Sequence, residues 1–427
     1  MPIILERRRA ARLVSATRPA AVAALLLIAS CGGNSNIYTL SAPNRVAIAD
    51  FNGDGLNDLV VASAEIDQTG QNQNSPGLVG VILQNASSHG TFVATVDYQS
   101  SGNPSGLAVA DLTGSGSKDI VVANFSNGNV SVLRHSGTAG QFQSALNFAT
   151  GGSPNDVVVA DMNGDGKPDL VIADGGATGH VIILPQDPAN PGHFLAPVTS
   201  AALPNRAIRV AVADLNGDGK PDVVVTSFDN YGNGGTVSIF FQDPANPGQF
   251  LPRVDIATPG NAASPNEPTG IAIADVNGDG LLDIVVSAQG NSSDTNGTTG
   301  ADVFLQTSPG VFSAGITYGG ITTVGALSVA VGDINGDGKV DLVLASQYPS
   351  GTGQLTLILQ DPANPGVFLD ATQTYLSGLG KPVVAVLGDL NGDGLLDIAT
   401  ADGTGAVVYF NTPATPGSFA SGFQVGG

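Results

Sequence analysis

The chain has 427 residues, with 36 acidic and 15 basic side chains and a formal net charge of −21. A surface this negative repels nucleic-acid phosphates and anionic lipid headgroups, so we expect neither nucleic-acid binding nor electrostatic docking to a membrane. Charged residues make up only 12% of the chain, and the 58 glycines and 26 prolines favour short strands joined by tight turns over helices.

The N-terminus has the pattern of a targeting segment. After an arginine-rich start, a small and apolar run of eleven residues covers Ala20–Ser30, which is too short to span about 30 Å of hydrocarbon. Cys31, the only cysteine, follows the sequence Leu-Ile-Ala-Ser, which resembles the lipobox of bacterial lipoproteins. We therefore expect residues 1–30 to be a lipoprotein signal peptide and residues 31–36 to be a lipidated cysteine with its tether. The protein would be exported and lipid-anchored to the periplasmic or surface face of the bacterial cell envelope. An ordinary cleaved signal is the alternative.

A nine-residue motif, D-x-N-G-D-G-x-x-D, recurs along the rest of the chain. The first aspartates of successive copies are 50 to 61 residues apart. This count includes an eroded copy, D-L-T-G-S-G-S-K-D, at Asp111–Asp119. The six complete copies are Asp50–Asp58, Asp161–Asp169, Asp214–Asp222, Asp275–Asp283, Asp333–Asp341 and Asp389–Asp397.

Each copy lies in the same local context. A small apolar segment such as Val46–Ala49 precedes it and a β-branched run such as Leu59–Ala62 follows it, which predicts strand, loop and strand. A third apolar stretch, for example Val237–Phe241, leads through a turn to a Gly-x-Phe tripeptide that occurs seven times, and a fourth strand follows. Four strands in about 56 residues predict one antiparallel blade.

Seven such blades packed around an axis bury both faces of each sheet and leave few exposed edges. We therefore predict an all-β fold in which residues 37–427 form one seven-bladed β-propeller of four-stranded antiparallel blades. An open β-solenoid is the alternative, but calcium-binding β-helices repeat about every nine residues. Two closures of the ring stay open, since either Ile37–Leu40 or Phe419–Val425 can supply the outer strand of the last blade.

The motif has the chemistry of a site for a hard cation. Oxygen-bearing side chains occupy positions 1, 3, 5 and 9, and Ca²⁺ takes six to eight oxygens at about 2.3–2.6 Å. Mg²⁺ demands tighter octahedral geometry, and Zn²⁺ would need His or Cys ligands. An EF-hand or dockerin loop needs a carboxylate at position 12, which is instead apolar or Thr. A metal-free turn of Asp and Asn residues is the remaining alternative.

With these loops the chain resembles bacterial VCBS and FG-GAP-repeat proteins and, more distantly, the propeller of the integrin α-subunit, although the literal FG and GAP triplets are absent. The resemblance implies about six Ca²⁺ sites, each with four side-chain ligands and the carbonyl of position 7. In chain order the implied ligands are Asp50, Asn52, Asp54, Leu56 and Asp58; Asp161, Asn163, Asp165, Lys167 and Asp169; Asp214, Asn216, Asp218, Lys220 and Asp222; Asp275, Asn277, Asp279, Leu281 and Asp283; Asp333, Asn335, Asp337, Lys339 and Asp341; and Asp389, Asn391, Asp393, Leu395 and Asp397.

The eroded copy departs from this pattern. Its equivalent residues are Asp111, Thr113, Ser115 and Asp119, so one amide and one carboxylate are missing. We expect this loop to bind Ca²⁺ weakly or not at all.

Recognition is expected on the face opposite the motif loops, where the connections vary most in length and are rich in polar residues. These connections are Glu65–Gly80, Asp229–Gly235, Thr258–Thr269, Gln289–Gly300 and Tyr348–Gly353. We expect a monomeric binding module for an extracellular protein or glycan, with calcium in a structural role. The alternative is a propeller enzyme acting on extracellular polysaccharide, a lyase or a glycosidase. The four histidines are scattered and form no catalytic constellation, so we do not expect an enzyme.

Overall fold

Each repeat of the sequence forms one antiparallel sheet whose strands follow one another in chain order. The computed structural model describes residues 43–425 except 65–75, 94, 229–234, 262–263, 290–298, 322–324, 348–352, 370–373, 380–382 and 403–404. The chain divides into the units Met1–Tyr38 and Thr39–Gly427, and only the second unit contains described residues. The targeting segment and Ile37–Leu40 therefore lie outside the described residues.

The first two strands of each blade flank the motif loop. The innermost strands are β1 (Pro43–Ala49), β5 (Pro104–Ala110), β9 (Pro154–Ala160), β13 (Arg206–Ala213), β19 (Glu267–Ala274), β25 (Gly325–Gly332) and β29 (Val384–Gly388). The second strands, each beginning at the ninth motif residue, are β2 (Asp58–Ala64), β6 (Asp119–Asn124), β10 (Asp169–Asp174), β14 (Asp222–Phe228), β20 (Asp283–Gln289), β26 (Asp341–Gln347) and β30 (Asp397–Ala401).

The outer half of each blade is built from two further strands. The third strands are β3 (Gly77–Ile82), β7 (Asn129–Leu133), β11 (His180–Leu184), β15 (Gly235–Phe240), β21 (Thr299–Phe304), β27 (Gly353–Ile358) and β31 (Ala406–Tyr409). The fourth strands are β4 (Val96–Gln99), β8 (Leu146–Ala149), β12 (Val198–Thr199), β16 (Val254–Ala257), β24 (Ile316–Ile321), β28 (Thr374–Leu379) and β32 (Phe423–Val425). The remaining elements are a 3-10 turn, η1 (Phe125–Asn127), and two small hairpins, β17 (Gly260–Asn261) with β18 (Ser264–Pro265) and β22 (Gln306–Ser308) with β23 (Val311–Phe312).

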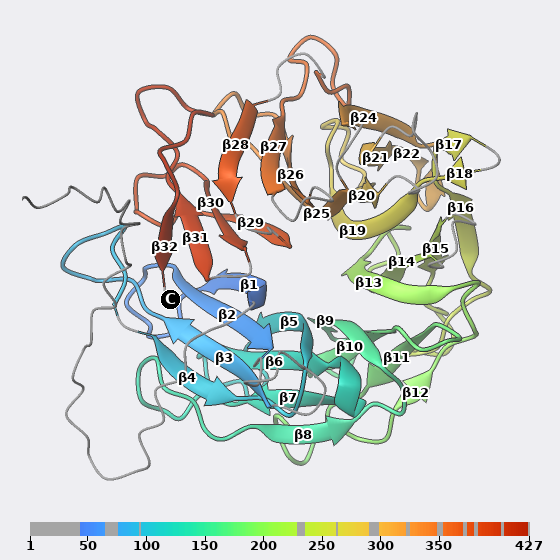
Figure 1. Ribbon diagram of the computed structural model, residues 1–427. Helices are drawn as coiled ribbons and strands as arrows, with labels where there is room; N and C mark the ends of the chain where they lie inside the picture. The colour runs from blue at the N-terminus through green and yellow to red at the C-terminus, as the bar shows by residue number, and fades with distance from the viewer. Residues whose placement is uncertain are drawn as a thin grey trace, which may run out of the picture. The chain divides into compact units, whose positions relative to one another are not determined.

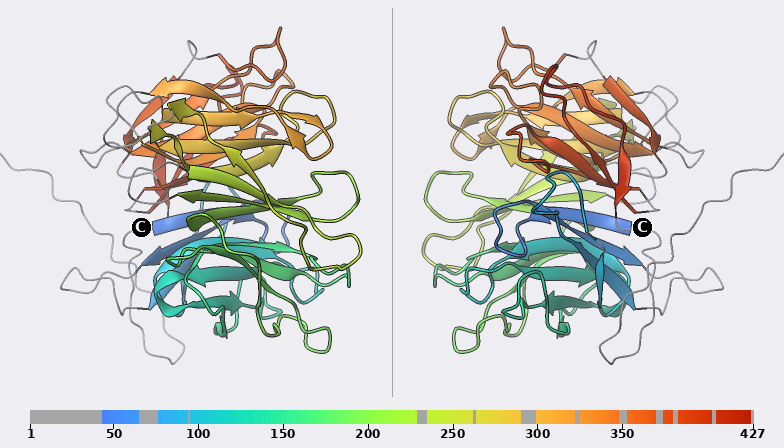
Figure 2. Two further views of the ribbon diagram at one scale, coloured as in Figure 1. Left: turned by 90° about the vertical axis from the view of Figure 1, so that its right-hand side faces the viewer. Right: turned by 90° about the vertical axis from the view of Figure 1, so that its left-hand side faces the viewer.

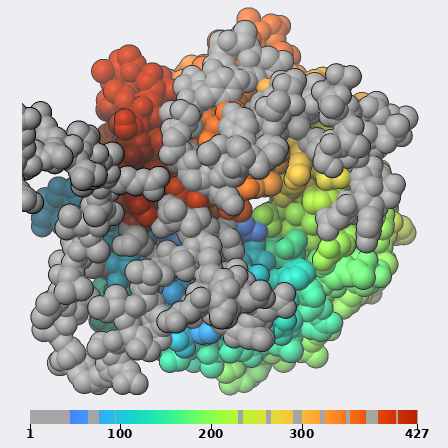
Figure 3. All heavy atoms as spheres, in the orientation of Figure 1, coloured from blue at the N-terminus to red at the C-terminus, as the bar shows by residue number. Residues whose placement is uncertain are grey.

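The seven sheets close into a ring, so the predicted seven-bladed β-propeller is confirmed (Figure 1). Each innermost strand contacts the innermost strands of both neighbouring blades, and β1 and β29 close the circle. In the space-filling view the described residues pass around the ring in chain order, from blue to red (Figure 3). Among the described residues, the fourth strand of the last blade is β32, which lies in the C-terminal segment Phe419–Val425.

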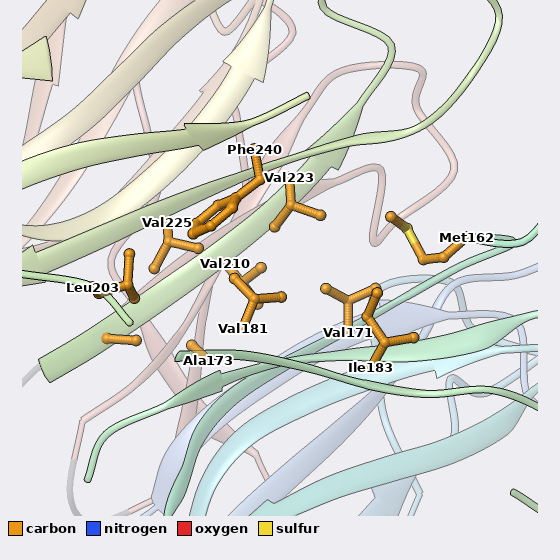
Figure 4. Close-up of a cluster of buried hydrophobic side chains, with 11 residues drawn as sticks. Met162, Val171, Ala173, Val181, Ile183, Leu203, Val210, Val223, Val225 and Phe240 are labelled. Atoms are coloured by element: carbon orange, nitrogen blue, oxygen red, sulfur yellow. The ribbon is translucent and has the colours of Figure 1, made fainter. Parts of the chain in front are cut away.

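The hydrophobic core lies between the blades. The second strand of each sheet is covered on both faces, as in β10 where all six residues are buried, so it reads as a continuous apolar run rather than an alternating one. Between the third and fourth blades Val171 and Val181 meet Val223, Val225 and Phe240 (Figure 4). Equivalent clusters join other neighbouring blades.

The motif loops and the third-to-fourth turns share one face of the ring, as expected from the strand order. The phenylalanine of each Gly-x-Phe pairs with the segment after the third strand, which fixes the turn. In six of the seven blades this glycine lies against position 3 of the motif loop in the preceding blade. A Cβ on Gly366 would meet that of Asn277 at 3.0 Å, and one on Gly417 would meet that of Asn335 at 3.2 Å. Figure 2 shows the ring from its edge, with the turns of the motif-loop face extending away from the strands.

Hydrogen bonds also join neighbouring blades at every junction on this face. In six junctions the carbonyl of the second motif residue accepts one from the following blade, as when Gln242 Nε2 donates to Met162 O at 2.8 Å. At the seventh junction, Asn57 Nδ2 in the first blade donates to Asp389 O in the last at 2.9 Å. On the motif-loop face, hydrogen bonds therefore connect each blade to the next around the whole ring.

We predict that Gly366→Ala destabilises the ring by more than Gly137→Ala does. Both glycines have left-handed φ angles, of 78° and 85°, so an alanine at either position costs about 1–2 kcal/mol of backbone strain. Only Gly366 lies against a neighbouring blade, and the added methyl group there costs about 1–3 kcal/mol more. Equal losses for the two variants in chemical denaturation would contradict the packing role of this turn.

Candidate metal centres

Position 1 of each complete loop organises the turn by accepting backbone hydrogen bonds. In the first loop Asp50 Oδ1 accepts from Gly53 N at 2.6 Å and Asp50 Oδ2 accepts from Gly55 N at 2.9 Å. The two glycines have φ angles of 78° and 85°, which allow the chain to wrap around the carboxylate. The other five complete loops repeat both hydrogen bonds at 2.6–2.9 Å.

The side-chain oxygens of positions 3 and 5 also accept backbone hydrogen bonds within the loop. Asn52 Oδ1 accepts from Asp54 N at 2.8 Å, and Asp54 Oδ1 accepts from Leu56 N at 2.9 Å. These two hydrogen bonds recur in all six complete loops. Each loop therefore presents two carboxylates and one amide oxygen along one wall.

The ninth aspartate has a structural role that the sequence did not reveal. Asp58 is fully buried, and its two oxygens accept backbone hydrogen bonds from Phe51 N at 2.9 Å and Gln84 N at 2.7 Å. All seven motif copies, the eroded one included, share this arrangement. The ninth residue thus fastens the loop to the end of the third strand. Its role as a metal ligand stays a prediction.

Burial of this aspartate raises its affinity for a proton. Desolvation raises the pKa of Asp58 to about 6 against the two backbone hydrogen bonds, and the neighbouring Asp54 and Asp50 carboxylates add to the rise. The pKa values of Asp169, Asp341 and Asp397 are also raised to about 6, chiefly by burial. Each complete loop therefore holds three carboxylates close together, and burial makes the ionised form of the ninth one costly.

An amide residue after the third strand completes the loop wall, and sequence reasoning missed it. Gln84 Nε2 donates to Asn57 O at 2.8 Å, and the equivalent Gln242 donates to Pro221 O at 3.2 Å as well as to the preceding blade. The available signal was a Gln or Asn eight residues before the phenylalanine of Gly-x-Phe in five repeats. In the second blade this position is His135, so the blade with the eroded loop also lacks this amide.

The donor set of the complete loops fits Ca²⁺. Two ion pairs join described residues, His180–Asp174 and Arg253–Asp255, and neither involves a loop aspartate. Within the same residues, no three His, Cys, Asp or Glu side chains form a group suited to a metal ion. A calcium loop also draws on amide and main-chain oxygens, and hard oxygen donors without a cationic partner are the groups that Ca²⁺ prefers.

The eroded loop keeps the backbone shape without the full donor set. Asp111 Oδ2 accepts from Gly116 N at 2.7 Å, as in the complete loops, and Asp119 fastens the loop in the usual way. Ser115 offers only a hydroxyl where the other loops have a carboxylate. The turn of the eroded loop therefore forms without the amide oxygen of position 3 and the carboxylate of position 5.

The opposite face is described only in part. Most of Glu65–Gly80, Asp229–Gly235, Gln289–Gly300 and Tyr348–Gly353 lies outside the described residues. Within Thr258–Thr269, Asn266 Nδ2 donates to the buried Asp302 at 3.1 Å. Asp302 also accepts from Thr317 Oγ1 at 2.6 Å, so this connection is tied to the fifth blade.

The histidines are scattered in the structure as they are in the sequence. His135 packs edge-on against Phe142, and His193 packs in the same way against Phe148. His180 Nδ1 lies 3.5 Å from Asp174 Oδ2, and Asp174 Oδ1 also accepts a hydrogen bond from the backbone N–H of Ser153 at 2.7 Å.

These features define the chain as a repeat β-propeller with aspartate-rich loops on one face. The family model described as FG-GAP-like repeat matches residues 50–122, 111–172, 161–225, 214–286 and 333–400, and the chain belongs to this family. No curated protein sequence matches the chain.

A search of solved structures confirms the fold. The structure titled "Structure of Dos1 propeller" is similar, with a TM-score of 0.53 and 14% sequence identity over 91% of this chain and 86% of the other. No helix of the described residues is long and apolar enough to cross a membrane.

We predict a stoichiometry of six Ca²⁺ per chain. Asp218→Asn should lower it by one, because position 5 loses its carboxylate while the amide keeps the size of the side chain. The double variant Thr113→Asn, Ser115→Asp should raise it to seven, because it restores the missing donors on a backbone that already has the right shape. Calorimetric titration of the metal-stripped protein measures both. An unchanged stoichiometry in both variants would rule the loops out as the sites.

A second prediction concerns the buried Asp302 on the opposite face. Burial raises its pKa from 3.8 to about 6, so its ionised form is destabilised in the fold. The stability that its neutral form contributes is full below about pH 4 and is lost as the pH rises through 6. Relative to Asp302→Asn, the wild-type protein should lose about 2 kcal/mol between pH 4 and pH 7. Denaturation curves at saturating calcium test this, and parallel pH profiles for the two proteins would contradict it.

Proposed function

We propose that this protein is an exported, calcium-stabilised interaction module. The observation that carries the proposal is the arrangement shared by six loops, in which carboxylate and amide oxygens line one wall and no described cationic side chain pairs with them. The FG-GAP-repeat propeller supports the assignment as a binding scaffold.

Calcium acts on stability in this proposal. The six complete loops contain eighteen aspartates, and six Ca²⁺ would return twelve positive charges to a chain whose formal charge is −21. Extracellular modules bind Ca²⁺ with Kd values near 10⁻⁴–10⁻³ M. At ten times Kd one site adds about 1.4 kcal/mol, so six independent sites add roughly 8 kcal/mol, comparable with the stability of a whole domain.

Each ion would also bear on a junction between blades. The asparagine at position 3 has its Cβ against the glycine turn of the following blade, and the carbonyl of position 2 accepts a hydrogen bond from the same blade in six junctions. An ion that fixes positions 1, 3 and 5 therefore fixes the surface on which the next blade packs. Calcium would stiffen the ring as well as the loop.

Recognition is assigned to the opposite face. The motif-loop face is built from near-identical turns that are occupied by contacts between blades, whereas the opposite connections differ from blade to blade. Their polar residues suit an extracellular protein or glycan, and the rigid ring holds them in place. Export and lipidation at Cys31 would hold the protein at the cell envelope, in contact with external calcium.

Chelation tests the role of calcium. We expect the metal-stripped protein to melt at a temperature lower by well over 10 °C than the protein in 5 mM CaCl₂, with MgCl₂ restoring only part of the difference. An unchanged melting temperature in the presence of chelator would contradict the structural role of calcium. The binding role is tested separately by glycan-array and pull-down measurements on the calcium-saturated protein, where turnover of a polysaccharide would instead favour an enzyme.

A further inference from the structure

The motif loops contain a chemically reactive sequence that the proposed function does not account for. The chain has nine Asn-Gly pairs, and six of them occupy positions 3 and 4 of the complete loops. Glycine has no side chain to shield its backbone nitrogen, so an asparagine that precedes glycine loses its amide more readily than one that precedes a larger residue. The eroded loop has Thr113 at position 3 and therefore has no amide to lose. Each complete loop contains one asparagine that is intrinsically prone to deamidation.

The deamidation of such an asparagine needs no reagent except water. The backbone nitrogen of the glycine attacks Cγ of the asparagine and forms a C–N bond. The side-chain nitrogen leaves as ammonia, which takes up the proton lost from the glycine N–H. Water then opens the cyclic imide at either of its carbonyls and gives aspartate or isoaspartate. The net reaction consumes one water and releases one ammonia, without oxidation or reduction.

The folded loop directs the attacking nitrogen away from its target. Gly53 N donates its hydrogen to Asp50 Oδ1 at 2.6 Å, and the other complete loops have the same hydrogen bond at 2.6–2.8 Å. The electron pair freed by removal of this hydrogen would lie along the N–H bond, so it would point at Asp50 rather than at Cγ of Asn52. The negative carboxylate also opposes the formation of a nitrogen anion beside it.

The asparagine amide is itself held in place by hydrogen bonds. Asn52 Oδ1 accepts from Asp54 N at 2.8 Å, and Asn52 Nδ2 donates to Asp54 Oδ2 at 3.1 Å. The first bond recurs in all the other complete loops and the second in four of them. In five of the six loops the asparagine Cβ also lies against the glycine turn of the following blade. Rotation of the amide toward the glycine nitrogen would break its hydrogen bonds.

We propose that the six asparagines at position 3 are latent deamidation sites, which the closed loop keeps unreactive and which an opened loop exposes to modification. The protecting contacts are hydrogen bonds of the chain itself, so the proposal does not depend on calcium. The modification is irreversible in its effect, because isoaspartate lengthens the backbone between positions 3 and 4 by one methylene group. The two glycines are then displaced from the carboxylate at position 1, and the loop can no longer close.

Deamidation rates of the wild-type protein test the proposal without any variant. Mass spectrometry of proteolytic peptides measures the rate at each asparagine, and incubation in heavy-oxygen water labels the carboxylates formed before digestion. We expect all six asparagines to react at least about tenfold more slowly in the folded protein than in the chain unfolded with urea and chelator. Equal rates in the two states would overturn the proposal. A faster reaction in the folded protein would also overturn it and would mark the carboxylate at position 1 as a base.

Removal of one carboxylate tests the mechanism within a single loop. Asp214→Ala takes away the acceptor of Gly217 N, so Asn216 should react at least about tenfold faster than in the wild-type protein while the asparagines of the other loops keep their rates. Asp243→Ala is the matched control, because this carboxylate lies in the third-to-fourth turn of the same blade and accepts hydrogen bonds within that turn. An unchanged rate at Asn216 in Asp214→Ala, or an equal rise in Asp243→Ala, would overturn the proposal.

Discussion

A buried aspartate with two backbone hydrogen bonds is the contact on which every blade of this propeller depends. Asp58 and its six counterparts accept from the second motif residue on one side and from the residue after the third strand on the other. Three strands and one loop are thereby joined at a single carboxylate, and the cost of burying that charge is offset by two charge-assisted hydrogen bonds. Because the eroded copy retains it through Asp119, this contact belongs to the fold itself.

The metal loop and the contact between blades are built on the same short segment. The carboxylate at position 1 accepts the backbone hydrogen bonds that shape the turn, and the carboxylate at position 9 joins the loop to the end of the third strand. Between them, the carbonyl of position 2 accepts a hydrogen bond from the next blade, and position 3 packs against a glycine of that blade. A charge imbalance at this segment therefore acts on the ring rather than on one loop alone. In the proposed calcium-bound protein, this coupling would let an ion held in one motif loop act on the packing between two blades.

The repeat made the fold predictable. Seven copies of one motif, each between apolar runs, specify four strands per blade, and seven blades fill a ring, so number, order and pairing of strands agree with the sequence expectation. The composition of the last blade was ambiguous because Ile37–Leu40 and Phe419–Val425 are equally suitable as outer strands, and only the pairing of β32 with β31 distinguishes them.

The residue types of the candidate site could be predicted from the sequence, but the different roles of the four loop positions could not. The spacing of the motif shows that four oxygen-bearing side chains recur in each loop. It does not show that the aspartate at position 9 is buried, or that a backbone N–H about 26 residues away donates to it, as Gln84 N does to Asp58.

Anomalous diffraction from crystals grown in calcium, at a wavelength where calcium scatters, tests the central claim most directly. The account predicts six peaks, each enclosed by positions 1, 3 and 5 of a complete loop, and none in Asp111–Asp119. Complete loops that hold no calcium under these conditions would contradict it, and the aspartates would then be turn-forming residues alone.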